Sequence, residues 1–224
     1  MVDDTLAIRE HLRQVAHLRT ARNADPELAR RAAAVKAYQH ARFSHDYAAL
    51  IESPRHGAAT RFFLDDLYGP ADFADRDAQF ERIVPAMARL LPAEVMHTVA
   101  QLAELHALSE GLDQQMALSM ASAVVDEQSY RAAWQTVGRA ADRERQLSLL
   151  LLIGASLDRH TRSAWLAPSL KLMRGPARAA GLGQLQSFLE RGLAAFSAMK
   201  GAQEFLDAIA ANERKVIVEL FSKR

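Results

Sequence analysis

Residues 92–113 read PAEVMHTVAQLAELHALSEGLD, and their apolar residues recur at the spacing of an α-helix. Steps of three or four positions place such residues on one face at about 3.6 residues per turn. The members of this apolar stripe are Val95, Val99, Leu102 and Leu105. Proline is typical of a helix start and glycine of a helix end. Pro92 and Gly111 therefore predict a helix that runs toward residue 111.

The same spacing dominates on both sides of this stretch, and convincing strand alternation is absent. Asp25-Pro26 and Ser53-Pro54 combine an N-cap residue with a proline that suits the first helical position. Gly69-Pro70 predicts a helix stop, and Pro85 predicts a kink or a break in a helix that begins near Asp75. The other predicted helices are residues 5–22, 113–124, 129–138, 142–160, 162–174, 184–199 and 202–221.

The chain shows no fixed-period repeat and no Gly/Ser-rich or Pro-rich linker. The sequence therefore predicts one all-α domain over residues 1–224, a single-domain bundle of roughly eight to ten helices. Half of the 224 residues are hydrophobic and a quarter are charged, which provides ample material for a core.

Several classes of function are excluded by composition. Without cysteine, the chain has no disulfide, thiolate nucleophile or iron–sulfur cluster. The longest apolar run, residues 149–155, is far shorter than the ~18 residues of a membrane span. The acidic start, Met1 to Asp4, lacks the basic-then-apolar order of a secretory signal. We expect a cytoplasmic protein with no membrane partner.

Charge is unevenly distributed along the chain. Residues 62–113 carry 10 Asp and Glu against 3 Lys and Arg, a net charge of −7, whereas the whole chain carries +1. Basic residues alternate with acids elsewhere and form no basic–aromatic block, which argues against a nucleic-acid surface. The acidic middle suits either a docking face for a partner or ordinary solvated helix ends.

The densest motif in that acidic segment is residues 62–77, FFLDDLYGPADFADRD. Aromatic rings and aspartates around Gly69-Pro70 are typical of a loop that its rings hold to the body of the protein. An EF-hand is excluded, because Phe80 and Ala86 stand where the loop needs glycine and glutamate. The segment serves either as a structural clamp or as a binding surface. The candidate binding residues are Phe63, Asp66, Tyr68, Asp72, Phe73, Asp75, Arg76 and Asp77.

His106 is the candidate metal or haem ligand. On a helix of about 100° per residue, Val99 lies about 20° and Leu102 about 40° from it. Glu110 falls about 40° to the side, one turn further on, and Asp113 also falls near this line. His106 is thus predicted on the buried stripe beside a carboxylate. Such a pair either satisfies a core histidine or ligates a metal, with Glu110 as the second ligand.

Catalytic motifs are scarce. The sequence contains no HExxH, no Gly-x-Ser-x-Gly, no phosphate-binding glycine loop and no dinucleotide fingerprint. An enzyme that acts on a small metabolite is left open, but a protein without enzymatic activity is favoured.

Residues 62–92, together with LAELHALSEGLD at residues 102–113, resemble a group of uncharacterised all-helical bacterial proteins with an FFLxDLYGPxDFxxRD segment. The resemblance covers residues 60–115 and, more faintly, residues 188–221. It implies a helical architecture. It implies no substrate and no catalytic residue.

Two hypotheses follow. The first is a non-enzymatic helical binding or regulatory protein that uses the acidic aromatic loop to dock a protein partner or a small ligand, without a cofactor. The alternative is a helical haem- or metal-binding protein, globin-like or haem-oxygenase-like, that uses His106. A homodimer is left open.

Overall fold

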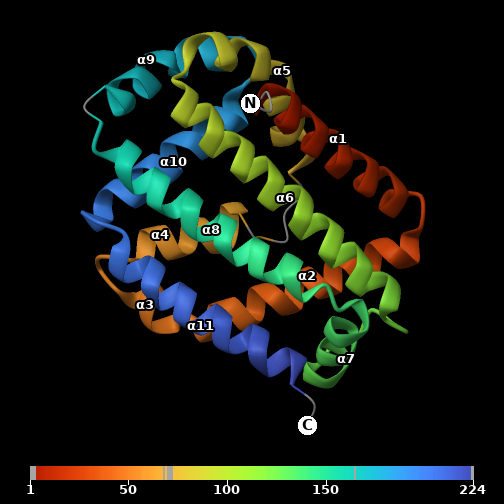
Figure 1. The fold of residues 1–224 in the computed structure, drawn as a ribbon. Helices are drawn as coiled ribbons and strands as arrows, with labels where there is room; N and C mark the ends of the chain where they lie inside the picture. The colour runs from red at the N-terminus through yellow and green to blue at the C-terminus, as the bar shows by residue number, and fades with distance from the viewer. Residues whose placement is uncertain (1–3, 68, 70–72, 164, 223–224) are drawn as a thin grey trace.

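The computed structural model describes residues 4–67, 69, 73–163 and 165–222, and α-helices joined by short turns make up most of this part (Figure 1). The elements are α1 (Asp4–Asn23), α2 (Pro26–Asp46), α3 (Ala48–Glu52), α4 (Gly57–Arg61), the π-helix η1 (Phe62–Leu67), α5 (Ala74–Leu90), α6 (Ala93–Ser119), α7 (Glu127–Val137), α8 (Ala140–Thr161), α9 (Leu166–Ala179), α10 (Gly183–Met199) and α11 (Gln203–Phe221). No strand occurs among the described residues. The all-α prediction is confirmed, with α3 and α4 as short helices that the sequence did not separate.

Local capping signals fixed the start of α2. The Asp25 carboxylate accepts hydrogen bonds from the backbone N–H groups of Glu27 and Leu28, at 2.9 and 3.1 Å. Pro26 occupies the first helical position, where its missing N–H costs nothing. Ser53 accepts a similar bond from His56 N at 3.2 Å, but this signal opens only a turn before α4.

The predicted helix end at Gly111 is wrong. The helix α6 continues to Ser119 and includes most of the separate helix predicted at residues 113–124. Leu112 and Met116, just beyond the glycine, are fully buried, and burial of each stabilises the fold by about 1.5–3 kcal/mol. A glycine within a helix costs only about 1 kcal/mol relative to alanine. Burial therefore outweighs the local stop signal.

Pro85 does not break its helix. The helix α5 continues on both sides of it, and Pro85 is exposed. Water can solvate the carbonyl group that a proline leaves without a backbone donor. The break that the sequence allowed at this position is therefore wrong.

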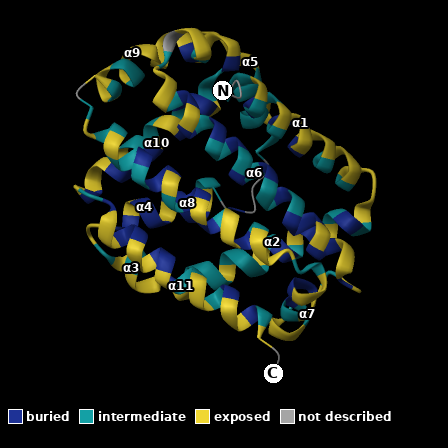
Figure 2. Cartoon of the chain, in the orientation of Figure 1, coloured by how far each residue is buried: buried dark blue, intermediate teal, exposed yellow. Residues whose placement is uncertain are grey.

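The helix α6 is the central element. It crosses the molecule between α1, α2 and α8 and packs against all three and against α7 (Figure 1). At 1.5 Å per residue its 27 residues span about 40 Å. Buried residues line the inner faces of the helices, whereas α9 is mostly exposed (Figure 2). Residues of α6 therefore face several other helices in the interior.

The π-helix η1 begins the acidic aromatic segment and was not predicted. Phe62, Phe63 and Leu64 are buried one after another in it. The Phe62 ring packs 5.3 Å from that of Phe188, and a Cβ at Gly192 of α10 would lie 2.8 Å from Phe62 Cζ. The rings therefore hold this segment to the body, and the close approach depends on glycine at residue 192.

No helix in the described part of the chain combines the length and the apolar character needed to cross a membrane.

Candidate functional site

The predicted docking residues are largely engaged with other parts of the protein. Phe63 is buried against the rings of Phe196 and Phe205. Asp66 forms an ion pair with Arg191 of α10. Asp75 is exposed in the first turn of α5, where an acid interacts favourably with the helix dipole. Tyr68 and Asp72 lie outside the described residues.

Arg76 joins the two ends of the acidic aromatic segment. Its guanidinium stacks 4.0 Å from the centre of the Phe73 ring and 4.7 Å from that of Phe188. Its Nη1 also donates to the backbone carbonyl of Asp66 at 2.7 Å. Cation–π contacts of this kind contribute about 0.5–2 kcal/mol each. Arg76 is thus positioned to act as the clamp of the segment.

His106 and Asp77 meet between α6 and α5. His106 Nε2 lies 3.0 Å from Asp77 Oδ2, and Arg19 Nη2 of α1 donates to the same oxygen at 2.9 Å. Burial raises the pKa of the Asp77 carboxyl, but hydrogen bonds and charge from His106, Arg19 and Arg76 bring it below its ordinary value. The carboxylate beside His106 therefore comes from another helix.

Glu110 has different partners. Arg22 Nη2 donates to its Oε2 at 2.8 Å, and Lys36 Nζ donates to its Oε1. Burial opposes ionisation of Glu110, yet these two cations lower its pKa to about 2. The described residues include no group of three or more His, Asp or Glu that could hold a metal ion. Metal or haem ligation by His106 and Glu110 stays a prediction.

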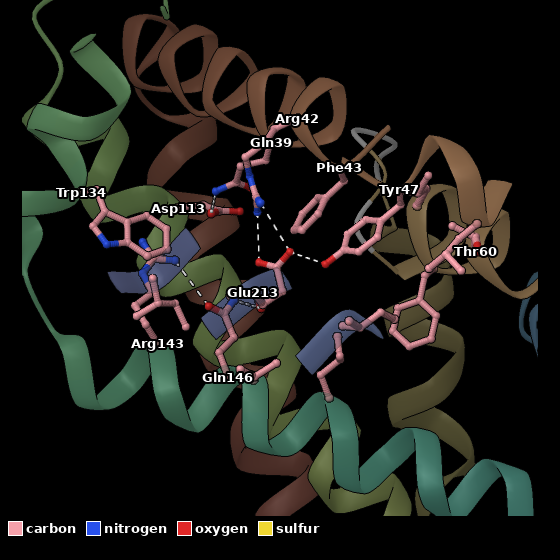
Figure 3. Close-up of a pocket in the computed structure, with 18 of the residues that line it drawn as sticks. Gln39, Arg42, Phe43, Tyr47, Thr60, Asp113, Trp134, Arg143, Gln146 and Glu213 are labelled. Carbon is pink, nitrogen blue, oxygen red and sulfur yellow. Dashed lines mark hydrogen bonds and ion pairs between the residues drawn. The ribbon is translucent and has the colours of Figure 1, made fainter. Parts of the chain in front are cut away.

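A cavity of about 90 Å³ lies further along α6 (Figure 3). Side chains from α2, α3, α4, η1, α6, α7, α8 and α11 line it. Most of the wall is aromatic or aliphatic, and ten of the twenty lining residues, two of them tyrosines, carry a hydroxyl, amide or charged group. The polar lining residues are Gln39, Arg42, Tyr47, Thr60, Ser109, Asp113, Tyr130, Arg143, Gln146 and Glu213. Apolar cavities with a few convergent polar groups are the usual form of a ligand site.

Glu213 is the centre of one polar group in this wall. The Tyr47 hydroxyl donates to its Oε1 at 2.5 Å, and Arg42 Nη2 lies 3.2 Å from its Oε2 (Figure 3). Burial, together with the charge of Glu213, raises the pKa of Tyr47. Tyr47 therefore remains a neutral donor.

Asp113 and Arg143 form the other polar group. Gln39 Nε2 donates to Asp113 Oδ1 at 2.9 Å, and burial raises the pKa of the Asp113 carboxyl. The Arg143 guanidinium lies 3.7 Å from the centre of the Trp134 ring and is almost fully buried.

Two buried donors in the wall have no acceptor. Trp134 Nε1 and Arg42 Nε find no hydrogen-bond partner among the described residues. Both groups donate only and never accept. A buried donor without an acceptor costs about 1–3 kcal/mol, so such groups need an explanation. An acceptor supplied by a ligand would provide one.

Sequence reasoning missed this cavity, although two of its acids were visible. Asp113 lies on the face of α6 that was predicted to be buried, and Glu213 continues the stripe of Phe205 and Ile209 on α11. An acid on a buried stripe is the signal that could have found the site. Gln39 and Arg42, three apart on α2, gave a weaker one.

A family model described as a domain of unknown function, DUF8198, matches residues 18–224 of this chain. No curated protein and no solved structure matches the chain.

Proposed function

Because the chain belongs to the DUF8198 family, whose function is unknown, we propose its function from the geometry: it is a binding protein for a small amphipathic acid, held in the cavity of Figure 3. The observation that carries this proposal is the pair of buried donors without acceptors, Trp134 Nε1 and Arg42 Nε. A ligand carboxylate offers two acceptor oxygens, and the apolar part of the wall suits a hydrocarbon body.

The charges in the wall favour an anion when Asp113 is protonated. Among the lining residues, Arg42 and Arg143 then carry two positive charges and Glu213 one negative charge, while Asp46, outside the lining, also pairs with Arg42 at 3.0 Å. Burial favours the protonated form of Asp113, and a bound anion nearby would favour it further. Binding should therefore be coupled to proton uptake, and affinity should fall as pH rises through the pKa of Asp113.

Size limits the part of the ligand that this cavity encloses. A cavity of about 150 Å³ is large enough to bind one benzene molecule, and the volume here is about 90 Å³. A carboxylate and the first few carbons of a chain fit this space. For a probe as small as butyrate we expect a dissociation constant on the order of 1 mM, which is about 4 kcal/mol.

Calorimetric titration with butyrate, butylamine and butanol tests the proposal. The acid should bind, and the amine and the alcohol should bind at least tenfold more weakly. Trp134→Phe removes one orphan donor and should weaken acid binding roughly tenfold, since a hydrogen bond to a charged group contributes about 1.5–3 kcal/mol. Trp165→Phe is the matched control, because Trp165 is exposed and lies outside the cavity.

The proposal fails if the acid does not bind, if the amine binds equally well, or if both tryptophan variants bind alike. Circular dichroism of each variant shows whether it is folded. The docking surface of the acidic aromatic loop stays a second, untested prediction, and exposed Asp75 is the described residue that favours it. The cytoplasmic location, bacterial origin and homodimer stay predictions as well.

A further inference from the structure

A second cavity, of about 110 Å³, lies between α1, α5, α6, α10 and η1. Eleven of its fifteen lining side chains are apolar. The polar ones are Arg76, Asp77, His106 and Ser109. This wall contrasts with that of the cavity in Figure 3, where half of the lining residues are polar.

The two cavities lie end to end along one face of α6. Val99, Leu102 and His106 line the second cavity, Ser109 lines both, and Asp113 lines the cavity of Figure 3. Steps of three and four residues keep all five on one side of the helix. From Val99 to Asp113 this face is about 21 Å long, at 1.5 Å per residue.

The π-helix η1 also extends from one cavity to the other, in the opposite chain direction to α6. Phe63 and Leu64 line the cavity of Figure 3, and Leu67 lines the second one. Because α6 and η1 each line both cavities with residues that are close in sequence, the two cavities are neighbours. The residue they share is a serine, whose Oγ accepts a hydrogen bond from Gln146 Nε2 at 2.7 Å. Ser109 therefore marks the place on α6 where the two cavities meet.

The charged groups of the second cavity already have partners. Asp77 bonds to Arg19 and His106, and Arg76 stacks on Phe188 while it donates to a backbone carbonyl. The rest of the wall is apolar, and none of the described residues that line it has a buried donor without an acceptor, in contrast to Trp134 and Arg42 in the cavity of Figure 3. This end therefore suits hydrocarbon, whereas the other end suits an acid group.

We propose that the second cavity is the tail subsite of the same ligand, so that the protein binds a linear alkyl carboxylate with its acid group near Trp134 and its chain along α6 toward Val99. This inference rests on the proposed function and names the ligand class, a fatty acid longer than the first cavity alone can enclose. Chain length, more than head-group chemistry, then sets affinity.

Titration with butyrate, octanoate and dodecanoate, each below its micelle concentration, tests the inference on the full chain. Each methylene that enters an apolar cavity contributes about 0.8 kcal/mol, a roughly fourfold gain in affinity. We expect octanoate to bind at least tenfold more tightly than butyrate. Butyrate affinity depends on the first cavity alone and reports on the proposed function separately.

Leu102→Phe fills the second cavity from α6 and should abolish the gain with chain length while it leaves butyrate affinity within twofold. Leu189→Trp, at the partly exposed rim on α10, fills the same space and serves if Leu102→Phe does not fold. Leu118→Phe, on an exposed face of α6, is the matched control and should behave as the wild type.

Three results overturn the inference. If butyrate binds but affinity does not rise with chain length, the tail subsite is refuted and the proposed function stands. If the gain with chain length survives in both cavity-filling variants, the chain lies elsewhere. If none of the three acids binds, the proposed function fails and the inference fails with it.

Discussion

Glu110→Gln tests the buried charge cluster that joins α1, α2 and α6. The Glu110 carboxylate is paired with Arg22 and Lys36, and the three side chains are only 8, 11 and 19% exposed. The pKa of Glu110 falls from its ordinary 4.5 to about 2, and at 1.36 kcal/mol per pH unit this difference corresponds to about 3 kcal/mol. Removing one partner of a buried pair typically costs about 3–5 kcal/mol. We expect Glu110→Gln to lower the free energy of unfolding by about 3 kcal/mol at pH 7.

The loss of stability in Glu110→Gln should depend on pH, because the pKa of Glu110 is lower in the folded state than in the unfolded state. A carboxyl whose pKa is lower in the folded state stabilises the fold above pH 4.5, and this contribution disappears as pH falls toward 2. The difference in free energy of unfolding between the wild type and Glu110→Gln should therefore become smaller as pH falls from 5 to 3. Urea unfolding followed by circular dichroism at 222 nm measures this difference at each pH.

Glu104 on the same helix provides the control. It forms a bidentate pair with Arg145, at 2.7 Å to each oxygen, but the two side chains are 30 and 47% exposed. Exposed pairs contribute about 0–1 kcal/mol, so Glu104→Gln should cost less than 1 kcal/mol at any of these pH values. The reasoning would be refuted if the two variants lost equal free energy of unfolding, or if the loss in Glu110→Gln did not change with pH.

Three further predictions concern stability. Gly192→Ala should cost about 1–3 kcal/mol, because the new Cβ would lie 2.8 Å from Phe62 Cζ. Gly111→Ala within α6, where the nearest atom to a new Cβ is Leu18 Cδ1 at 4.0 Å, should instead stabilise by up to ~1 kcal/mol. Urea titrations that show the reverse order would contradict the packing. Tyr47→Phe should cost about 1–3 kcal/mol in the same titration, since it removes the donor to the partly buried Glu213 carboxylate, and no loss would mean that this bond contributes nothing. Asp113→Asn should stabilise the protein at pH 7, because burial raises the pKa of Asp113 and the folded state then loses stability as pH rises above about 4. Thermal unfolding from pH 4 to pH 8 checks this, and a lower melting temperature for the variant at pH 7 would refute it.

The fold was predictable where the deciding information is local. Asp25 and Pro26 specify the start of α2 whatever the rest of the chain does, because the cap uses backbone groups two and three residues away. The end of α6 depends instead on long-range packing. Gly111 is a local stop signal, but Leu112 and Met116 beyond it are buried by other helices. Nothing within the stretch itself reveals that burial.

The surroundings of His106 and Glu110 were also predictable only where local information decides them. Helical periodicity placed His106 and the acids near it on the inner side of α6, but it could not supply partners from elsewhere in the chain. Asp77 lies 29 residues before His106, and Lys36 lies 74 residues before Glu110. Which carboxylate meets which cation depends on how α1, α2 and α5 pack against α6. One helix considered alone cannot show this.

Two buried acids on α6 make the distinction between stability and function concrete. Glu110 is surrounded by two cations and strongly ionised, as expected of a group that stabilises the fold. Asp113, three residues on, receives a hydrogen bond from an uncharged amide and has a raised pKa, so its charge is costly. Proteins tolerate such costs mainly at functional sites. Neutralising the first acid should therefore weaken the fold and neutralising the second should strengthen it, a difference in sign between two positions less than one helical turn apart.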